Sequence, residues 1–456
     1  MKVLESRIFD VINFLLSKIQ EKFDYVRQNS FLLSQIDYFI LIFIILTYFV
    51  SLFASTNIIG LVSFFVPFLV VFKVLMTKGE KLELEKNNFF LLLYLVICVI
   101  SCFSSSMISQ SLYGLMKTMI YFAFYFALCQ FLKSNKKYIL ILLFAIALLV
   151  SFESVIAIFQ SIVKVESIST WQDTSYVNPE DVLSRVYGTL KPYNPNLFAG
   201  WLLAGMGSIL GFAFIYLNKG KIKSTIISIV FFLISIFAVF QSGCRSAYLA
   251  LFVAIICVIF ASFYIVFYDL KIEKLKKIWK AILSVCVVST ILFMFFHSSI
   301  LKRLLSIFLL RGDSSTSFRM NVYNSAIQMF QDNPIFGIGV GNKVFREIYG
   351  LYMLSGYDAL SCYCVFLEMA VESGILSLIM YLCFLSVLLI NAYKKFVSTN
   401  ELNYKILVAI TSFSIIAVLF HGFFDTVYFR PQVQYVFWTM VAILTVLVKD
   451  EKIENK

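Results

Sequence analysis

The sequence predicts an all-α polytopic membrane protein, with about 12 transmembrane helices and a large outer cap loop between spans 9 and 10. Hydrophobic residues make up 61% of the 456 residues, and charged residues make up 14%. A soluble globular protein needs a much larger share of polar side chains to cover its surface. Apolar runs long enough to cross about 30 Å of hydrocarbon recur along the chain, so the composition excludes a soluble fold.

The apolar runs divide the chain into spans and loops. Residues 1–35 are interrupted by charges every three or four positions, which is typical of an amphipathic helix on the cytoplasmic face rather than a signal peptide. The predicted spans cover residues 36–53, 57–76, 89–105, 112–132, 138–160, 197–217, 224–241, 247–268, 281–297, 363–392, 404–426 and 432–448. The resulting regions are spans 1–5 in 36–160, an outer loop in 161–196, spans 6–9 in 197–297, the outer cap loop in 298–362, spans 10–12 in 363–448 and a cytoplasmic tail in 449–456.

Lys and Arg are concentrated in the short loops that face the same side as the N-terminus. Examples are "KGEKLELEK" (78–86), "NKGKIK" (218–223) and "DLKIEKLKKIWK" (269–280). Cytoplasmic loops carry an excess of these residues, so both termini are predicted to be cytoplasmic. This topology also accounts for the net charge of +12, and no nucleic-acid partner is expected.

The stretch "DNPIFGIGVGNKVF" (332–345) carries three glycines at alternate positions. Asn342 follows Gly341, where a dinucleotide fingerprint needs another glycine, and an outer loop has no access to nucleotides. Pro334 disfavours a helical conformation for the residue before it. The pattern therefore predicts an amphipathic helix over "SFRMNVYNSAIQMF" (317–330), a glycine turn, and a second helix around "NKVFREIYGLY" (342–352).

The nine cysteines do not indicate a disulfide framework or a metal site. Most of them lie within apolar runs, where cysteine behaves as a small hydrophobic side chain. Cys362 and Cys364 are close in sequence, but their spacing does not fit a zinc knuckle. Neither a metal nor another cofactor is expected.

Three arginines lie near the outer ends of the predicted spans. Arg245 follows the seventh span, Arg319 begins the predicted cap helix, and Arg430 precedes the last span. Arginine is always protonated and its planar fork matches phosphate oxygens, so together they favour a pocket for a lipid with a phosphate or pyrophosphate head. Taken singly, each arginine is also compatible with an anchor in the lipid headgroup region.

The other ionisable residues in the spans are also near the outer surface. Lys117 and Glu153 are predicted to lie at similar depths, so they are candidates for a structural ion pair or for substrate binding. His421 and Asp425 are four residues apart, which places them on one face of the predicted eleventh helix. Glu372, Asp425 and His421 are the candidates for a general base.

Five segments, in this order, resemble O-antigen ligase and polysaccharide polymerase membrane proteins. They are "YGTLKPYNPNLFAGWLL" (187–203), "SGCRSAYLAL" (242–251), "SFRMNVYNSAIQMFQDNPIFGIGVGNKVF" (317–345), "FLEMAVESGIL" (366–376) and "HGFFDTVYFRPQVQYVFW" (421–438). The residues of the later segments most resemble those of a cyanobacterial branch of the family, whose members are labelled as bicarbonate transporters. The resemblance covers roughly residues 187–438.

The resemblance implies a metal-independent glycosyltransferase in the bacterial inner membrane. Such enzymes take a glycan from an undecaprenyl-pyrophosphate carrier at the outer face and join it to a lipid acceptor or to a growing glycan. The resemblance implies that Arg319 and Arg245 hold the pyrophosphate, and Asn196 in the first segment is a further candidate for substrate binding. Ligases carry histidine and asparagine where this chain has Tyr363 and Cys364, which favours a polymerase-like member or a branch with another role.

Two other functions remain as alternatives at this point. A transporter of bicarbonate or another solute needs polar residues along a path to the cytoplasmic side, and below the outer third of the spans the sequence offers little beyond Lys73 at the cytoplasmic edge. A non-catalytic scaffold of a polysaccharide assembly complex would tolerate neutralisation of Arg245 and Arg319. The cost of burying charge favours glycan transfer over transport.

Overall fold

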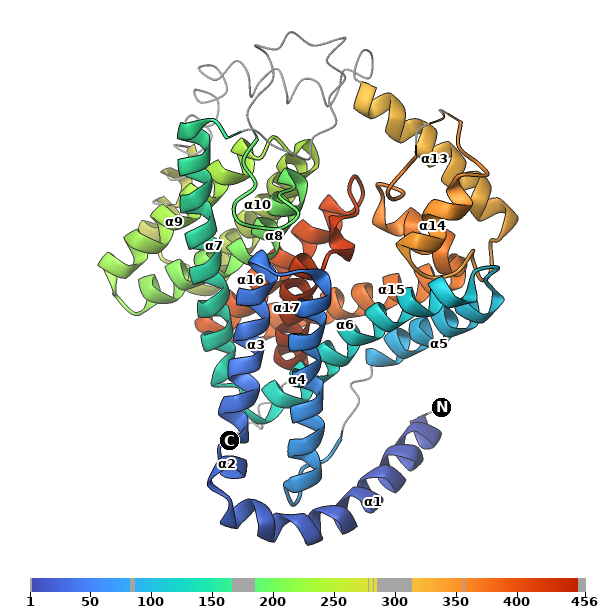
Figure 1. Cartoon of the computed structure of the whole chain (residues 1–456). Helices are drawn as coiled ribbons and strands as arrows, with labels where there is room; N and C mark the ends of the chain where they lie inside the picture. Colours follow the sequence, from blue (N-terminus) through green and yellow to red (C-terminus); the bar gives the residue numbers. More distant parts are fainter. Residues whose placement is uncertain are drawn as a thin grey trace.

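The computed structural model describes residues 2–82, 87–165, 185–281, 283–284 and 314–449, apart from 278, 355 and 357. Over these residues the protein is helical and has no strands, and ten helices are long and apolar enough to cross a membrane (Figure 1). These ten are α3 (Ile36–Phe53), α4 (Thr56–Met76), α6 (Ile108–Ser134), α7 (Tyr138–Val163), α8 (Pro195–Asn218), α9 (Ile222–Gln241), α10 (Arg245–Tyr264, continued by the π-helix η2, Ile265–Leu270), α15 (Val365–Ser398), α16 (Leu402–His421) and α17 (Pro431–Lys449). The predicted polytopic α-helical fold is confirmed.

The predicted spans agree with the observed helices with three qualifications. The apolar helix α5 (Asn88–Ser104) matches a predicted span but is shorter than the other ten. The span expected at 281–297 lies almost entirely outside the described residues. The prediction that the eleventh helix continues to residue 426 is wrong, because α16 ends at His421. The Gly422 carbonyl accepts a hydrogen bond from the Val365 N–H (2.7 Å), so it is not available to continue the helix.

Helices α8 and α17 form the centre of the bundle, and their membrane-spanning windows are almost completely buried. Asn194 caps α8 by accepting hydrogen bonds from the N–H groups two and three residues later, and Pro195 occupies the first turn. Glycines on α8 allow the neighbouring helix α16 to approach closely. A Cβ at Gly207 would lie 2.6 Å from Ser414 Oγ, and one at Gly211 would lie 2.2 Å from Ile410 Cδ1.

The long helix α15 is broken by Gly374, which has φ +81° and ψ 171°. The break frees carbonyl groups that a continuous helix would use. The Ile338 N–H donates to the Val371 carbonyl and the Gly339 N–H to the Glu372 carbonyl, both at 2.9 Å. The Ile375 N–H in turn donates to the Pro334 carbonyl, also at 2.9 Å. Residues 333–341, which we call the glycine turn, are therefore joined to α15 through main-chain hydrogen bonds.

The glycine turn is held between α15 and α6. A Cβ at Gly374 would lie 1.9 Å from the Ile335 carbonyl oxygen, and one at Gly114 on α6 would lie 2.4 Å from the Val340 carbonyl oxygen. Gly337, Gly339 and Gly341 all have positive φ angles. Only glycine tolerates such close approaches of backbone on both sides together with this backbone conformation.

Helices α13 (Ser314–Asp332) and α14 (Asn342–Tyr349) flank the glycine turn, as the sequence predicts. Together with the turn they form a unit that we call the cap, which has a small hydrophobic core distinct from that of the main bundle. Its buried side chains include Val322, Ala326, Met329, Val344, Phe345 and Tyr349.

Helix α1 (Lys2–Asn29) lies at the end of the bundle away from the cap (Figure 1), and the one-turn helix α2 (Phe31–Ser34) follows it. Gln20 Nε2 donates to the Val74 and Glu80 carbonyls, both at 2.8 Å, so α1 is attached to the end of α4. Lys73 at the same end forms ion pairs with Asp37 (2.9 Å) and Glu80 (3.1 Å). The amphipathic N-terminal helix expected from the sequence is present and is anchored by these contacts.

The Gly374→Ala variant should lose at least about 1–3 kcal/mol of folding free energy, because this φ/ψ region strongly favours glycine and the new Cβ would collide with Ile335. Gly60→Ala is the matched control. A Cβ at Gly60 would have no neighbour within 4 Å, so this helical substitution should stabilise by about 0.5–1 kcal/mol. Thermal unfolding in detergent measures both. Equal unfolding midpoints for Gly374→Ala and wild type would contradict the proposed role of the break.

Candidate functional site

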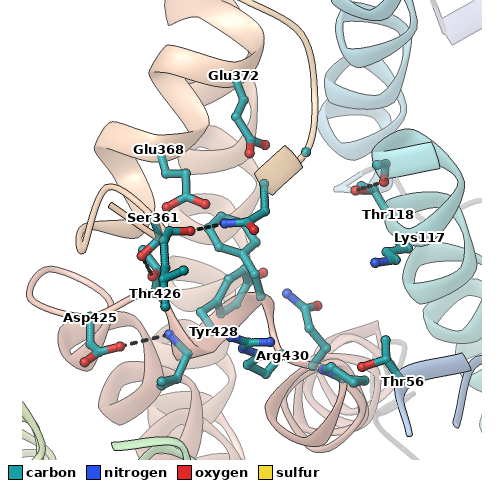
Figure 2. A pocket seen from close by; sticks show the side chains of 18 of the residues that line it. Thr56, Lys117, Thr118, Ser361, Glu368, Glu372, Asp425, Thr426, Tyr428 and Arg430 are labelled. Carbon is teal, nitrogen blue, oxygen red and sulfur yellow. Dashed lines mark hydrogen bonds between the residues drawn. The ribbon is translucent and has the colours of Figure 1, made fainter. Parts of the chain in front are cut away.

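A cavity with a volume of about 770 Å³ lies between α6, the glycine turn, α15 and the connection from α16 to α17 (Figure 2). It is at the end of the bundle nearest the cap, because Arg319, Lys343 and Arg346 of the cap line its wall. Both signs of charge are present, with an excess of cations. The ionisable lining residues are Lys117, Arg185, Arg319, Lys343, Arg346 and Arg430, together with Asp358, Glu368, Glu372 and Asp425.

Three of these cations, Lys117, Lys343 and Arg430, form no ion pair with a carboxylate within the described part of the chain, although Arg430 is near enough to Glu368 to interact with its charge. Two of them are close to one aromatic ring, since Lys117 Nζ lies 4.4 Å and Lys343 Nζ 5.6 Å from the centroid of Tyr113. Arg430 enters the cavity from the start of α17 (Figure 2). The cavity can therefore offer positive charge to an anion without first breaking an ion pair.

Arg319 is held in one orientation by three contacts. Its Nη1 donates to the Phe424 carbonyl (2.7 Å), and its Nη2 lies 3.7 Å from Asp425 Oδ2. The guanidinium carbon lies 5.1 Å from the centroid of the Tyr363 ring, within the range of a cation–π interaction. Burial raises the pKa of Tyr363, so the phenol remains protonated at neutral pH and serves as a surface under Arg319 rather than as a base.

Asp425 is the centre of a hydrogen-bond network that joins three segments of the chain. Its Oδ2 accepts from Asn196 Nδ2 (2.8 Å), and its Oδ1 accepts from the Val427 N–H (3.2 Å). Asn196 Oδ1 accepts from Arg185 Nη2 (2.5 Å), and Arg185 Nε donates to the Ser242 carbonyl (2.8 Å). The network ties the start of α8 and the end of α9 to the connection before α17, and through Asp425 it reaches Arg319.

Glu368 and Glu372 are buried on the first part of α15, one turn apart, and both line the cavity. Figure 2 shows them on the wall opposite Lys117. Glu368 Oε2 accepts a hydrogen bond from the Cys362 N–H (2.9 Å), which fixes the chain as it enters α15. The carboxylate of Glu372 lies beside the Gly341 N–H at the end of the glycine turn.

Three residues expected at the site do not line the cavity. Of the two roles considered for Glu153, the ion pair with Lys117 is not formed, and the Glu153 oxygens instead accept from the Thr189 N–H (2.8 Å) and Oγ1 (2.5 Å). His421 is buried, with Nε2 3.4 Å from Cys244 Sγ. Arg245 is the first residue of α10, next to Cys244, and also lies outside the cavity lining.

The far wall of the cavity is aromatic. Trp438 and Phe122 line it, with ring centroids 4.9 Å apart. Behind them, Tyr125 lies 5.1 Å and Phe384 6.2 Å from Trp438. These packed rings close the cavity toward the middle of the bundle. No group of three His, Cys, Asp or Glu side chains within the described ranges is arranged to hold a metal ion.

Sequence reasoning missed several residues that line the cavity. Arg185 lies in a polar loop, where an arginine carries no signal of burial or function. Lys343 and Arg346 lie on the second cap helix, whose position against α6 is a tertiary feature. Glu368 is one helical turn before Glu372, so the i to i+4 spacing within "FLEMAVES" was the available signal.

Two substitutions of Glu368 distinguish what its hydrogen bond and its charge each contribute to the folding free energy. Glu368→Ala leaves the buried Cys362 N–H without its acceptor and should cost about 1–3 kcal/mol of folding free energy. Glu368→Gln keeps an acceptor oxygen, so it should cost less than the alanine variant. Thermal unfolding of both variants in detergent measures the difference. Equal losses would show that the charge, rather than the hydrogen bond, is responsible.

Residues 230–382 match a protein-family model described as O-antigen ligase. The match covers about a third of the chain and includes α10, the cap and the first part of α15, which carry Arg245, Arg319 and Glu372. No curated protein matches the chain. The likeness to a bicarbonate-transporter branch gains no support from these comparisons. Over the matched residues the chain is similar to O-antigen ligases, which indicates a multi-pass membrane protein of the glycan ligase or polymerase type.

Proposed function

We propose that this protein transfers or polymerises a glycan from an undecaprenyl-pyrophosphate carrier at the outer face of a bacterial inner membrane. The observation that carries the proposal is the cavity in which Lys117, Lys343 and Arg430 form no ion pair with a carboxylate among the described residues. The similarity of residues 230–382 to O-antigen ligases supports the same reaction class.

The cations suit the leaving group of this reaction. As the bond between the sugar and the pyrophosphate breaks, negative charge develops on the phosphate oxygens. Fixed positive groups at that position stabilise the charge without having to reorganise. Arg319 adds a planar donor whose orientation is set by Tyr363 and the Phe424 carbonyl.

The cavity also provides groups for the acceptor. The acceptor hydroxyl oxygen forms a bond to the anomeric carbon, the carbon–phosphate oxygen bond breaks, and the pyrophosphate leaves with the electron pair. We assign the role of general base, which takes the proton of the acceptor hydroxyl, to Glu372, whose carboxylate lies in the cavity wall. Hydroxyl groups that suit glycan hydroxyls also line the cavity, on Thr56, Thr118, Ser361 and Thr426.

The remaining candidates take supporting roles in this proposal. Asp425 and Asn196 position Arg319 and the start of α8 through their hydrogen bonds. Arg245 begins α10 beside Cys244, in the matched region, and we propose that it supports the carrier-binding end of the bundle. His421 and Glu153 are assigned to structure, since their contacts are with Cys244 and Thr189 rather than with the cavity.

The distribution of lysine supports an outward-facing cavity with both termini in the cytoplasm. Residues near the N-terminal ends of α4, α6, α8 and α15 line the cavity. The opposite ends of the same four helices lead into connections rich in lysine, at Lys78, Lys81, Lys133, Lys136, Lys137, Lys219, Lys221, Lys394 and Lys395. The positive-inside rule assigns these connections to the cytoplasm and the cavity to the other face.

The aromatic wall favours glycan transfer over transport of a solute. A transporter needs its binding site to connect alternately with both faces. Phe122, Tyr125, Phe384 and Trp438 pack against one another where such a path would leave the cavity. A transferase needs access only from the outer face and from the lipid.

Removal of a cavity cation should slow transfer from the lipid-linked donor. Lys117→Met and Arg430→Gln should each lower kcat/KM by about a hundredfold to a thousandfold, which is typical for losing one fixed group that stabilises developing negative charge. The measurement is release of undecaprenyl pyrophosphate and growth of the glycan with purified protein. Lys191→Gln, an exposed lysine outside the cavity lining, is the control and should match wild type. Wild-type turnover that neither cavity variant reduces would overturn the proposal.

Glu372→Gln should lower kcat while leaving the donor KM unchanged, because the amide keeps the shape of the side chain but cannot accept the proton. A general base contributes about a hundredfold or more, so a loss of that size is expected. Glu347→Gln on α14, exposed and outside the cavity lining, is the control. A rise in donor KM at constant kcat would instead assign Glu372 to binding.

A further inference from the structure

A second hollow, of about 320 Å³, lies between α4 and α6 and is lined mainly by apolar side chains. Its walls include Gly60, Leu61 and Phe64 on α4 and Met116 and Ile120 on α6. We call it the α4–α6 groove. Four residues line both the groove and the main cavity, so the two spaces adjoin. They are Thr56, Tyr113, Lys117 and Tyr121.

The groove opens toward the outside of the bundle. Leu61, Phe64 and Met116 are 62%, 53% and 61% exposed, on helices long and apolar enough to span a membrane. In a bilayer such side chains face the hydrocarbon chains of the lipids. An apolar chain can therefore pass from the bilayer into the groove without crossing water.

We propose that the α4–α6 groove holds the part of the carrier's isoprenoid chain nearest the pyrophosphate, an assignment that rests on the proposed function. The junction between groove and cavity carries the charges that such a molecule requires. Lys117 lines both spaces, and Lys343, which lines the main cavity, is close to the same Tyr113 ring. A phosphate bound by these lysines has the charged cavity on one side and the apolar groove on the other.

The groove favours a molecule with a single chain. The α4–α6 groove is an apolar opening at the cation-lined junction, and a polyprenyl pyrophosphate has one chain attached directly to its phosphate. A phospholipid has two chains joined through glycerol, so one of them would remain outside this groove. The occupant we assign is therefore the polyprenyl chain, and a phospholipid is the competing outcome of the test.

Gly60 lies in the wall of the groove, and a Cβ at this position would have no neighbour within 4 Å. Its φ lies in the region open to ordinary residues. A tryptophan here has room to start into the groove and would occupy part of its space. Ile58→Trp is the matched control, because Ile58 is 52% exposed on the same helix but does not line the groove.

The test compares two donors that carry the same glycan on pyrophosphate, one with the undecaprenyl chain and one with a methyl group in its place. Wild type and Ile58→Trp should both have a lower KM for the undecaprenyl donor than for the methyl donor. Gly60→Trp should raise KM for that donor by about tenfold, the effect of losing about 1.4 kcal/mol of binding, and should leave the methyl donor unchanged. An unaltered donor preference in Gly60→Trp would overturn the groove assignment. Failure of wild type to use either donor would instead refute the proposed function.

Photo-crosslinking gives a second readout that does not depend on turnover or on one substitution. A diazirine placed on the first isoprene units of undecaprenyl pyrophosphate should label Leu61, Phe64 or Met116, and unlabelled undecaprenyl pyrophosphate should compete. Labelling confined to other helices would contradict the proposal. Labelling of the same residues by a diazirine phospholipid that undecaprenyl pyrophosphate fails to displace would assign the groove to bulk lipid.

Discussion

The cavity depends on the break in α15 at Gly374. The break leaves the Val371 and Glu372 carbonyls without helical partners, and a buried unpaired carbonyl is costly. N–H groups of the glycine turn bond to these carbonyls, which joins the cap to the bundle. Glu372 lies just before the break and Lys343 just after the turn, so these main-chain hydrogen bonds bring a carboxylate and a cation into the lining of one cavity.

The charged groups of the cavity have two different roles. The ion pair of Arg319 with Asp425 joins the cap to the α16–α17 connection, and that of Arg346 with Asp358 joins α14 to the segment before α15. The cations that form no ion pair in the described part of the chain supply the positive charge that an anionic ligand can use. The ion-paired arginines therefore hold the cavity walls in place, and the cations that form no ion pair remain available to a ligand.

Several residues of this cavity could be predicted from the sequence. An ionisable residue in an apolar span is energetically costly, so it stands out in the sequence as a functional candidate. The cavity lining includes Lys117, Glu372 and Asp425, which were singled out in this way, and also Arg319 and Arg430, which were singled out beside the spans. The same reasoning failed for Glu153. Equal depth in the membrane does not specify the direction in which a side chain points, and α7 turns Glu153 toward Thr189 instead of Lys117.

The sequence by itself determined the helical membrane fold and the positions of most spans, because the length of an apolar run and the placement of lysines are local properties of the chain. Only the tertiary structure decided which side chains share the cavity. Arg185 is hydrogen-bonded to Asn196, and Asn196 is hydrogen-bonded to Asp425, which lies 229 residues farther along the chain. The α4–α6 groove likewise lies between residues of two different helices. Such arrangements depend on how helices pack, which no local pattern encodes.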